Sequence, residues 1–520
     1  MNRTQPVSSV ADYDRLTKAP LALKNVAARS EHPRPRKGLR PRPDSGPRFL
    51  STSLFCLSAG AGKRKGIVMT DRTERGATAF RLNLEQQKNR AKDLLRAVKA
   101  GDSEALSRLA AARRSSITSD SPDGPHATAK LADAQFVIAR ELRFASWAKL
   151  KAHIESMDRQ RAAIDEKRPA PDADLKTLHI RCGHDIQEKL VKGGFVGDFL
   201  PYITPYCVGP VRQGPEGQEL MARFIVEAFF EEEGSDVVAG QLEGLLHRQH
   251  LLDRSAEDYE RVVIWKEQDN WCQTVLARLL AHYANAKRPR VLELIALDDF
   301  PGGERFMGLG NLPEEALRLL WSSRKPVTSA QLALGHDAWN ALSSDDPRHL
   351  AAVARSGTPA LPIMAPALHR HLRELPSVEN GLRLTEQLIL QIVSEGTADG
   401  LRLWADVWHR LVERDPHPWI TDTWFLQVIK DMLAGSGPLL TFTRIPPHPD
   451  QTTVLLPSQL AGPCRQLLAI TELGRTVLHG ERDWHSLRHF SRWVGGVHIL
   501  PGVAGWRWDE AKRDAVLREA

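Results

Sequence analysis

Cysteine is scarce in this sequence of 520 residues, and long apolar runs are missing. The five cysteines are widely spaced and odd in number, and they contain no CxxC pair, which excludes a disulfide framework and a common zinc signature. A reducing, cytoplasmic location fits this pattern. No apolar run reaches the roughly 18 residues of a membrane-spanning helix, so we expect no membrane segment.

Several catalytic signatures are missing as well. The sequence has no GxGxxG fingerprint, no P-loop, no HExxH, no GxSxG elbow and no set of kinase motifs. These absences argue against a dinucleotide-dependent enzyme with that fingerprint, a P-loop ATPase, a zinc protease of the HExxH type, an α/β-hydrolase and a protein kinase.

The net charge of +7 is concentrated at the amino terminus. Residues 1–69 contain 14 Lys and Arg against 4 Asp and Glu, which leaves 57 basic and 60 acidic residues in the rest of the chain. We interpret 1–69 as a disordered basic tail, and as an alternative we consider that translation begins at Met69. Because the remaining body is slightly acidic, nucleic-acid binding is disfavoured.

What is present is the composition of a folded protein, with 42% hydrophobic and 26% charged residues. Four β-type runs at 178–182, 197–200, 261–266 and 291–297 alternate with helical patterns, which predicts an α/β domain with a mostly parallel, Rossmann-like sheet. The predicted order is a helical module (70–158), a linker (159–174), the α/β domain (175–312), a helical segment (313–380), a winged-helix-like domain (381–482) and a C-terminal segment (483–520).

Acidic side chains follow three of the four predicted strands. Asp185 comes after the first, Glu267 and Asp269 after the third, and Asp298 after the fourth. Because ligands of open α/β sheets bind beyond the carboxyl ends of the strands, these carboxylates are candidate ligands of Mg²⁺ or Mn²⁺. The alternative is that they are helix caps, since Asp185 and Asp269 stand where N-caps belong.

Other polar residues near the same edge extend the candidate site. His184 is a candidate general base, because it is next to a carboxylate, and a surface histidine is the alternative. Gly183, Asp185, Glu304 and Arg305 are candidate ligand-binding residues. The glycine-rich loop 301–310 is predicted either to approach a phosphate through its backbone amides or to be a long turn.

The segment 381–482 shows the order helix, helix, helix, wing. It contains nine Lys and Arg against eleven Asp and Glu, whereas a DNA reader needs basic side chains on its recognition helix and wing. We therefore expect this domain to contact another protein or to be purely structural.

Several blocks of the chain resemble a bacterial family known as domain of unknown function 1835. They cover roughly 177–510 and include LHIRCGHD from Leu178, FPGGERFMGLG from Phe300 and RWVGG from Arg492. One departure is Glu267-Gln268-Asp269, where the family pattern would have a histidine in the middle. Residues 131–154 also resemble a helical module that is found beside ankyrin repeats. Neither resemblance implies a known activity.

The sequence thus predicts a cytoplasmic protein that binds a small ligand or has a regulatory, protein-binding role. A Mg²⁺- or Mn²⁺-dependent enzyme acting on a phosphorylated or nucleotide substrate is the second hypothesis, with Asp185, Glu267, Asp269 and Asp298 as metal ligands and His184 as base. A transcription regulator is the third, suggested only by the winged-helix order.

Overall fold

The computed structural model describes residues 80–114, 129–230, 234–302, 305–396, 401–435, 437–444 and 466–518. The predicted basic tail and Met69 lie outside these residues. The described helices and strands belong to one compact unit that spans residues 59–520.

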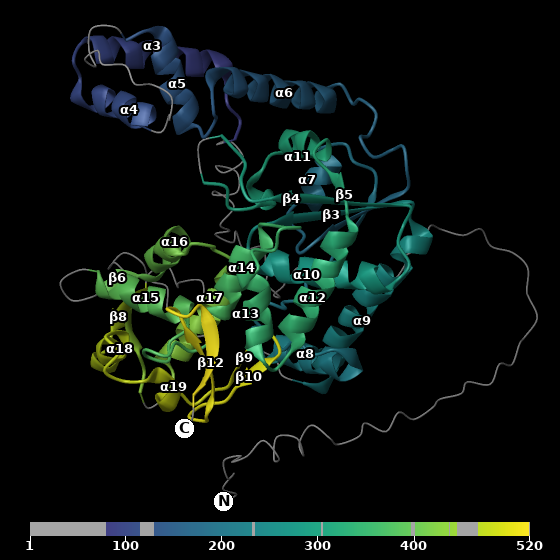
Figure 1. Cartoon of the computed structure of the whole chain (residues 1–520), viewed down its shortest axis with the longest axis vertical. Helices are drawn as coiled ribbons and strands as arrows, with labels where there is room; N and C mark the ends of the chain where they lie inside the picture. Colours follow the sequence, from purple (N-terminus) through teal and green to yellow (C-terminus); the bar gives the residue numbers. More distant parts are fainter. Residues whose placement is uncertain are drawn as a thin grey trace, which may run out of the picture. The chain divides into compact units, whose positions relative to one another are not determined.

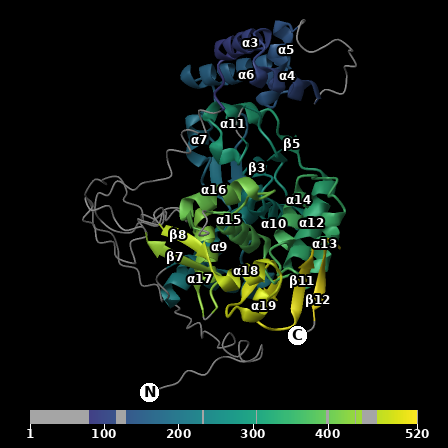
Figure 2. The ribbon, with the colours of Figure 1, turned by 90° about the vertical axis from the view of Figure 1, so that its left-hand side faces the viewer.

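The first four described helices form the predicted helical module. They are α3 (Leu84–Lys99), α4 (Ser103–Arg114), α5 (Leu131–Glu141) and α6 (Trp147–Asp165), which lie together in both views (Figures 1 and 2). Their apolar faces meet in one cluster that includes Leu94, Val98 and Ile138. Residues three or four positions apart lie on the same side of a helix, and the apolar residues of these helices show this spacing in the sequence.

The linker predicted at 159–174 begins too early, because α6 continues to Asp165. Two contacts explain the longer helix. Met157 packs in the core beside α11 (Glu314–Trp321), and Arg161 forms an ion pair with the buried Glu315, 2.9 Å away. The charged residues of this stretch up to Asp165 therefore belong to a helix that is fixed on the α/β domain.

The α/β domain is built on a five-stranded, mostly parallel sheet in the order β2-β1-β3-β4-β5. Strands β1 (Thr177–Arg181), β2 (Asp198–Pro201), β3 (Arg261–Glu267) and β4 (Val291–Leu297) are parallel, as predicted. Strands β1 and β3 lie inside the sheet and are buried along their whole length. Burial on both faces explains the continuous apolar run 262–265 in β3.

Helices cover both faces of this sheet. Figure 1 shows α7 (Gln187–Lys192) and α11 on one side, with α10 (Asn270–Asn285) and α12 (Ser329–Ser343) on the other. Alternate residues of β3 point to the two sides: Val263 and Trp265 pack with α7 and α11, whereas Val262 and Ile264 pack with α10. Helices α8 (Gly214–Phe229) and α9 (Ser235–Asp258) connect β2 to β3.

The sequence predicted an all-helical segment at 313–380, and this prediction is wrong. Besides α11, α12, α13 (Pro347–Arg355) and α14 (Met364–Leu372), it contains the two-residue strand β5 (Lys325–Pro326), which is antiparallel to β4. Pro326 lacks a backbone N–H, and this is tolerated because β5 lies at the edge of the sheet.

The segment 381–482 contains the three predicted helices, α15 (Leu384–Ser394), α16 (Trp404–Arg414) and α17 (Asp422–Leu433), and then α18 (Glu472–Leu478). An antiparallel sheet in the order β6-β8-β7 accompanies them, made of β6 (Leu401–Leu403), β7 (Leu440–Arg444) and β8 (Gln466–Ile470). Strand β6 was not predicted, because its apolar residues continue directly into α16.

The chain ends in α19 (Trp484–Leu487) and two hairpins, β9–β10 (Arg492–Val494, Val497–Ile499) and β11–β12 (Gly505–Asp509, Asp514–Arg518). Buried Trp484 and Trp508 belong to the same hydrophobic cluster as the α10 face of the sheet. The segments after the α/β domain therefore share its core. In the described part of the chain, no helix is both long and apolar enough to cross a membrane.

Candidate functional site

The carboxyl ends of β1 and β3 lie side by side, because these strands are parallel neighbours. Strand β1 ends at Arg181 and β3 at Glu267. The structure thereby brings together three of the four carboxylates predicted to be metal ligands, namely those of Asp185, Glu267 and Asp269.

A buried arginine holds two of these carboxylates. Nη2 of Arg181 lies 2.6 Å from Glu267 Oε1 and 2.9 Å from Asp185 Oδ2, and Nε donates to Asp185 Oδ1 at 3.1 Å. Arg181 is only 3% exposed. Burial alone would raise the pKa of Asp185, but the charge and hydrogen bonds of Arg181 outweigh it and hold that pKa below its ordinary value. Arg181 is thus an internal counter-ion that the sequence analysis missed.

Asp185 is therefore not a helix cap. The N-cap position of α7 is occupied by Ile186, which makes no side-chain capping bond, and the Asp185 carboxylate is directed to Arg181 instead. Asp269 is the cap that the sequence suggested, since its Oδ1 accepts a hydrogen bond of 2.8 Å from the backbone N–H of Cys272 in the first turn of α10.

The glycine-rich loop packs directly against these carboxylates. The backbone N–H of Leu309 donates to Glu267 Oε2 at 2.6 Å. A Cβ at Gly308, where φ is +151°, would lie 2.9 Å from Glu267 Oε1, and one at Gly310 would lie 2.7 Å from Asp185 Oδ2. The glycines are required for this close approach, and the Leu309 amide binds a carboxylate of the protein itself.

Within this group, the Asp269 side chain has a pKa near neutral pH. Burial, followed by the negative charge of Glu267, raises its pKa to about 7, although its bond from the Cys272 backbone acts in the opposite direction. Near neutral pH the carboxyl group therefore exists in both its protonated and its ionised form.

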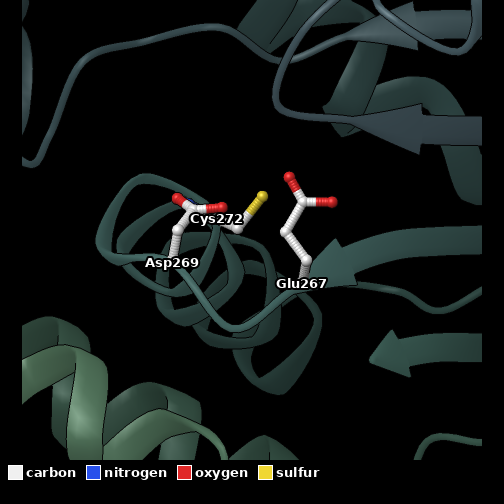
Figure 3. Close-up of side chains that lie close together, drawn as sticks. All are labelled: Glu267, Asp269 and Cys272. Atoms are coloured by element: carbon white, nitrogen blue, oxygen red, sulfur yellow. The ribbon is translucent and has the colours of Figure 1, made fainter. Parts of the chain in front are cut away.

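Glu267, Asp269 and Cys272 offer one donor atom each within 4.8 Å of one another (Figure 3). This donor set does not fit Mg²⁺ or Mn²⁺. The guanidinium of Arg181 already reaches Glu267, and its Nη1 donates to Cys272 Sγ at 2.9 Å, so a positive charge occupies this position. Mg²⁺ and Mn²⁺ prefer oxygen ligands, whereas burial raises the pKa of the Cys272 thiol and keeps it protonated.

The other predicted site residues lie apart from this group. Asp298 is exposed at the end of β4 and does not belong to it. His184 is bonded through Nδ1 to Gln187 Oε1 at 3.0 Å on the surface. Gly183 is buried beside Asp185. Arg305 donates to the backbone carbonyls of Val412, Glu413 and Asp415 at the end of α16, and Glu304 lies outside the described residues.

A cavity of about 400 Å³ lies elsewhere, between the β2–α8 connection and helices α8, α9, α10 and α12. None of the carboxylates at the strand ends lines it. Sequence reasoning missed this cavity, because its walls come from four helices and one loop that are distant in the chain. Its lining is largely polar and includes Tyr202, Tyr206, Arg212, Gln213, Gln249, Asp253, Arg278, His282, Asn285, His336, Trp339 and Asn340.

Hydrogen bonds between side chains fix the inner wall of the cavity. Gln249 Oε1 accepts from the Tyr202 hydroxyl at 3.1 Å and from Arg278 Nη2 at 2.7 Å, and Gln249 Nε2 donates to Asp253 at 2.6 Å. The guanidinium of Arg278 also lies over the ring of Trp339, 5.5 Å from its centroid. The side chains of this wall thus hold one another in place.

A second set of bonds joins the outer wall. Gln213 Nε2 donates to Asn340 Oδ1 at 3.1 Å, and the ring nitrogens of His336 contact the side-chain amides of Asn285 and Asn340 at 3.0 and 2.9 Å. These bonds connect the β2–α8 loop and α10 to α12. Burial lowers the pKa of His282 to about 4, so this histidine is neutral at neutral pH.

A comparison with models of known protein families finds none that matches this chain, and a search of curated proteins finds no similar sequence.

Proposed function

We propose that this chain binds a small polar molecule in the cavity between α8, α9, α10 and α12. The observation that supports this proposal is the cavity itself, because its volume of about 400 Å³ falls within the range of small-molecule sites, roughly 300 to 1,000 Å³. Its ordered polar walls are of the kind that orient a ligand, since their hydrogen bonds are already formed.

The lining favours a ligand with a planar ring and an anionic group. The lining contains two guanidinium groups, those of Arg212 and Arg278, against the single carboxyl group of Asp253. Tyr206 and Trp339 pack edge to face with their ring centroids 4.8 Å apart and supply an aromatic surface. A nucleoside monophosphate combines these two properties.

The C-terminal half of the chain supports a second part of the proposal, a regulatory contact with another protein. We interpret 381–482 as a winged-helix-like domain, because α15, α16 and α17 precede the antiparallel strands β7 and β8. Its nine basic and eleven acidic residues do not favour binding to nucleic acid.

We place the protein in the cytoplasm and regard its main sheet as Rossmann-like. The family resemblance stays a prediction.

Thermal unfolding of the full chain tests ligand binding. A molecule that binds only the folded state raises the unfolding midpoint. We expect nucleoside monophosphates to raise it and the matching nucleosides to raise it less. Gln249→Ala and Asn340→Ala should reduce the rise, because they remove polar groups of the inner and outer wall.

Gln187→Ala is the matched control, since this glutamine contacts His184 outside the cavity. Two results would refute the proposal: no midpoint change with any nucleotide, nucleoside or sugar phosphate, or a rise that is unchanged in both cavity variants.

A further inference from the structure

Two cysteines from distant parts of the chain meet at the carboxyl edge of the sheet. Cys182 directly follows β1, and Cys272 is in the first turn of α10, 90 residues later. Their sulfur atoms lie 2.8 Å apart. A disulfide bond holds its sulfurs at about 2.05 Å, so less than about 1 Å separates these two from bonding distance.

The surroundings of the two thiols differ, and this difference assigns their roles. Cys182 is half-buried and therefore within reach of a small oxidant, whereas Cys272 is fully buried. Cys272 Sγ accepts a hydrogen bond from Arg181 Nη1, so a guanidinium is positioned to stabilise the negative charge that develops on that sulfur as it loses its proton during the attack. The third described cysteine, Cys207, is buried as well.

We propose that Cys182 and Cys272 are a redox-active pair that a hydroperoxide converts into an intramolecular disulfide. The step joins the turn after β1 to the start of α10, beside the ion pairs of Arg181. Intracellular disulfides are usually transient and redox-sensing, which fits a pair located at a polar strand edge and not a structural framework.

The chemistry balances with hydrogen peroxide as the oxidant. The Cys182 thiolate attacks one peroxide oxygen, the O–O bond breaks, and the other oxygen leaves as water after taking up a proton, so that Cys182 becomes a sulfenic acid. The Cys272 thiol then attacks the Cys182 sulfur and gives up its proton as the S–S bond forms, the S–O bond breaks, and the departing oxygen takes up that proton and leaves as a second water. Two thiols have lost two electrons and two protons, and one peroxide has become two waters.

The experiment is a thiol count and a peptide map of the full chain before and after treatment with hydrogen peroxide. Of the five cysteines in the sequence, three should remain reactive in denaturant after oxidation. The peptides of Cys182 and Cys272 should be found linked, with a mass lower by two hydrogen atoms than the sum of the two peptides. Dithiothreitol should restore both free peptides.

Variants and one change of conditions distinguish this pair from accidental oxidation. Cys207→Ala should leave the linkage intact, whereas Cys272→Ala should remove it and leave Cys182 as a sulfenic or sulfinic acid. Peroxide added to the urea-unfolded chain should not favour this pair, because its proximity depends on the fold.

The wild-type map decides the question even if a variant fails to fold. Five reactive thiols after treatment, a linkage between other cysteines or between two chains, or the same linkage yield from the unfolded chain would each overturn the proposal.

Discussion

Asp269→Asn tests the electrostatics of the strand-end site. Asparagine is as good an N-cap as aspartate, so the capping bond to Cys272 is retained while the charge is removed. The pKa of Asp269 rises from an ordinary 3.8 to about 7 in the folded protein. Since each pKa unit is worth about 1.4 kcal/mol, the ionised carboxylate costs the folded state about 4 kcal/mol at high pH.

The sign follows from proton linkage. Because the folded-state pKa is raised, the contribution of Asp269 is fully present below its unfolded pKa near 3.8 and is lost as the pH rises through about 7. Between about pH 5 and about pH 8 the free energy of unfolding of the wild type should therefore fall by about 2 to 3 kcal/mol relative to that of Asp269→Asn. The variant should be the more stable protein at the higher pH.

Equilibrium urea unfolding of both proteins at the two pH values measures this difference, and other titrating groups cancel in it. Asp346→Asn is the matched control, because Asp346 is the N-cap of α13 and its hydrogen bonds from Arg348 lower its pKa. Asp346 therefore remains ionised across this range, and its variant should show the pH dependence of the wild type. If the free energy of unfolding of Asp269→Asn had the same pH dependence as that of the wild type, the inference that burial and Glu267 raise the pKa of Asp269 would be wrong.

Two further predictions concern Arg181. Arg181→Met should destabilise the protein by about 3 to 5 kcal/mol in urea unfolding, because it leaves the buried Glu267 carboxylate without its counter-ion, whereas Arg254→Met at an exposed ion pair should cost less than about 1 kcal/mol. Equal costs for the two variants would contradict this. Millimolar Mg²⁺ or Mn²⁺ should leave the thermal midpoint unchanged, because the guanidinium occupies the position of a cation. A rise that Asp185→Ala abolishes would instead support the metal-dependent enzyme.

The sequence alone was sufficient for the main α/β architecture. Alternation of β-type runs with helical patterns located β1 to β4 and predicted their parallel pairing, because each run can be recognised from its own neighbouring residues. The same reasoning placed Asp185, Glu267 and Asp269 at one edge, since parallel strands end on the same side of a sheet. The Asp269 cap could also be predicted, as capping is a local interaction.

Short strands and helix ends were less predictable. Strands β5 and β6 contain two and three residues, too few to show a period, and they are stabilised by pairing with strands distant in sequence. The extension of α6 into the predicted linker depends on Arg161 and its partner Glu315, which are 154 residues apart.

The functional features depend on tertiary structure. Arg181 becomes a counter-ion only because the β1–β3 pairing places its side chain beside Glu267, 86 residues away. The cavity exists only where four helices and one loop meet, and the Cys182–Cys272 contact only where β1 ends beside α10. Local sequence patterns determine which residues form strands, helices and caps. Contacts between residues that are distant in the sequence depend on tertiary packing, and local sequence patterns contain no information about them.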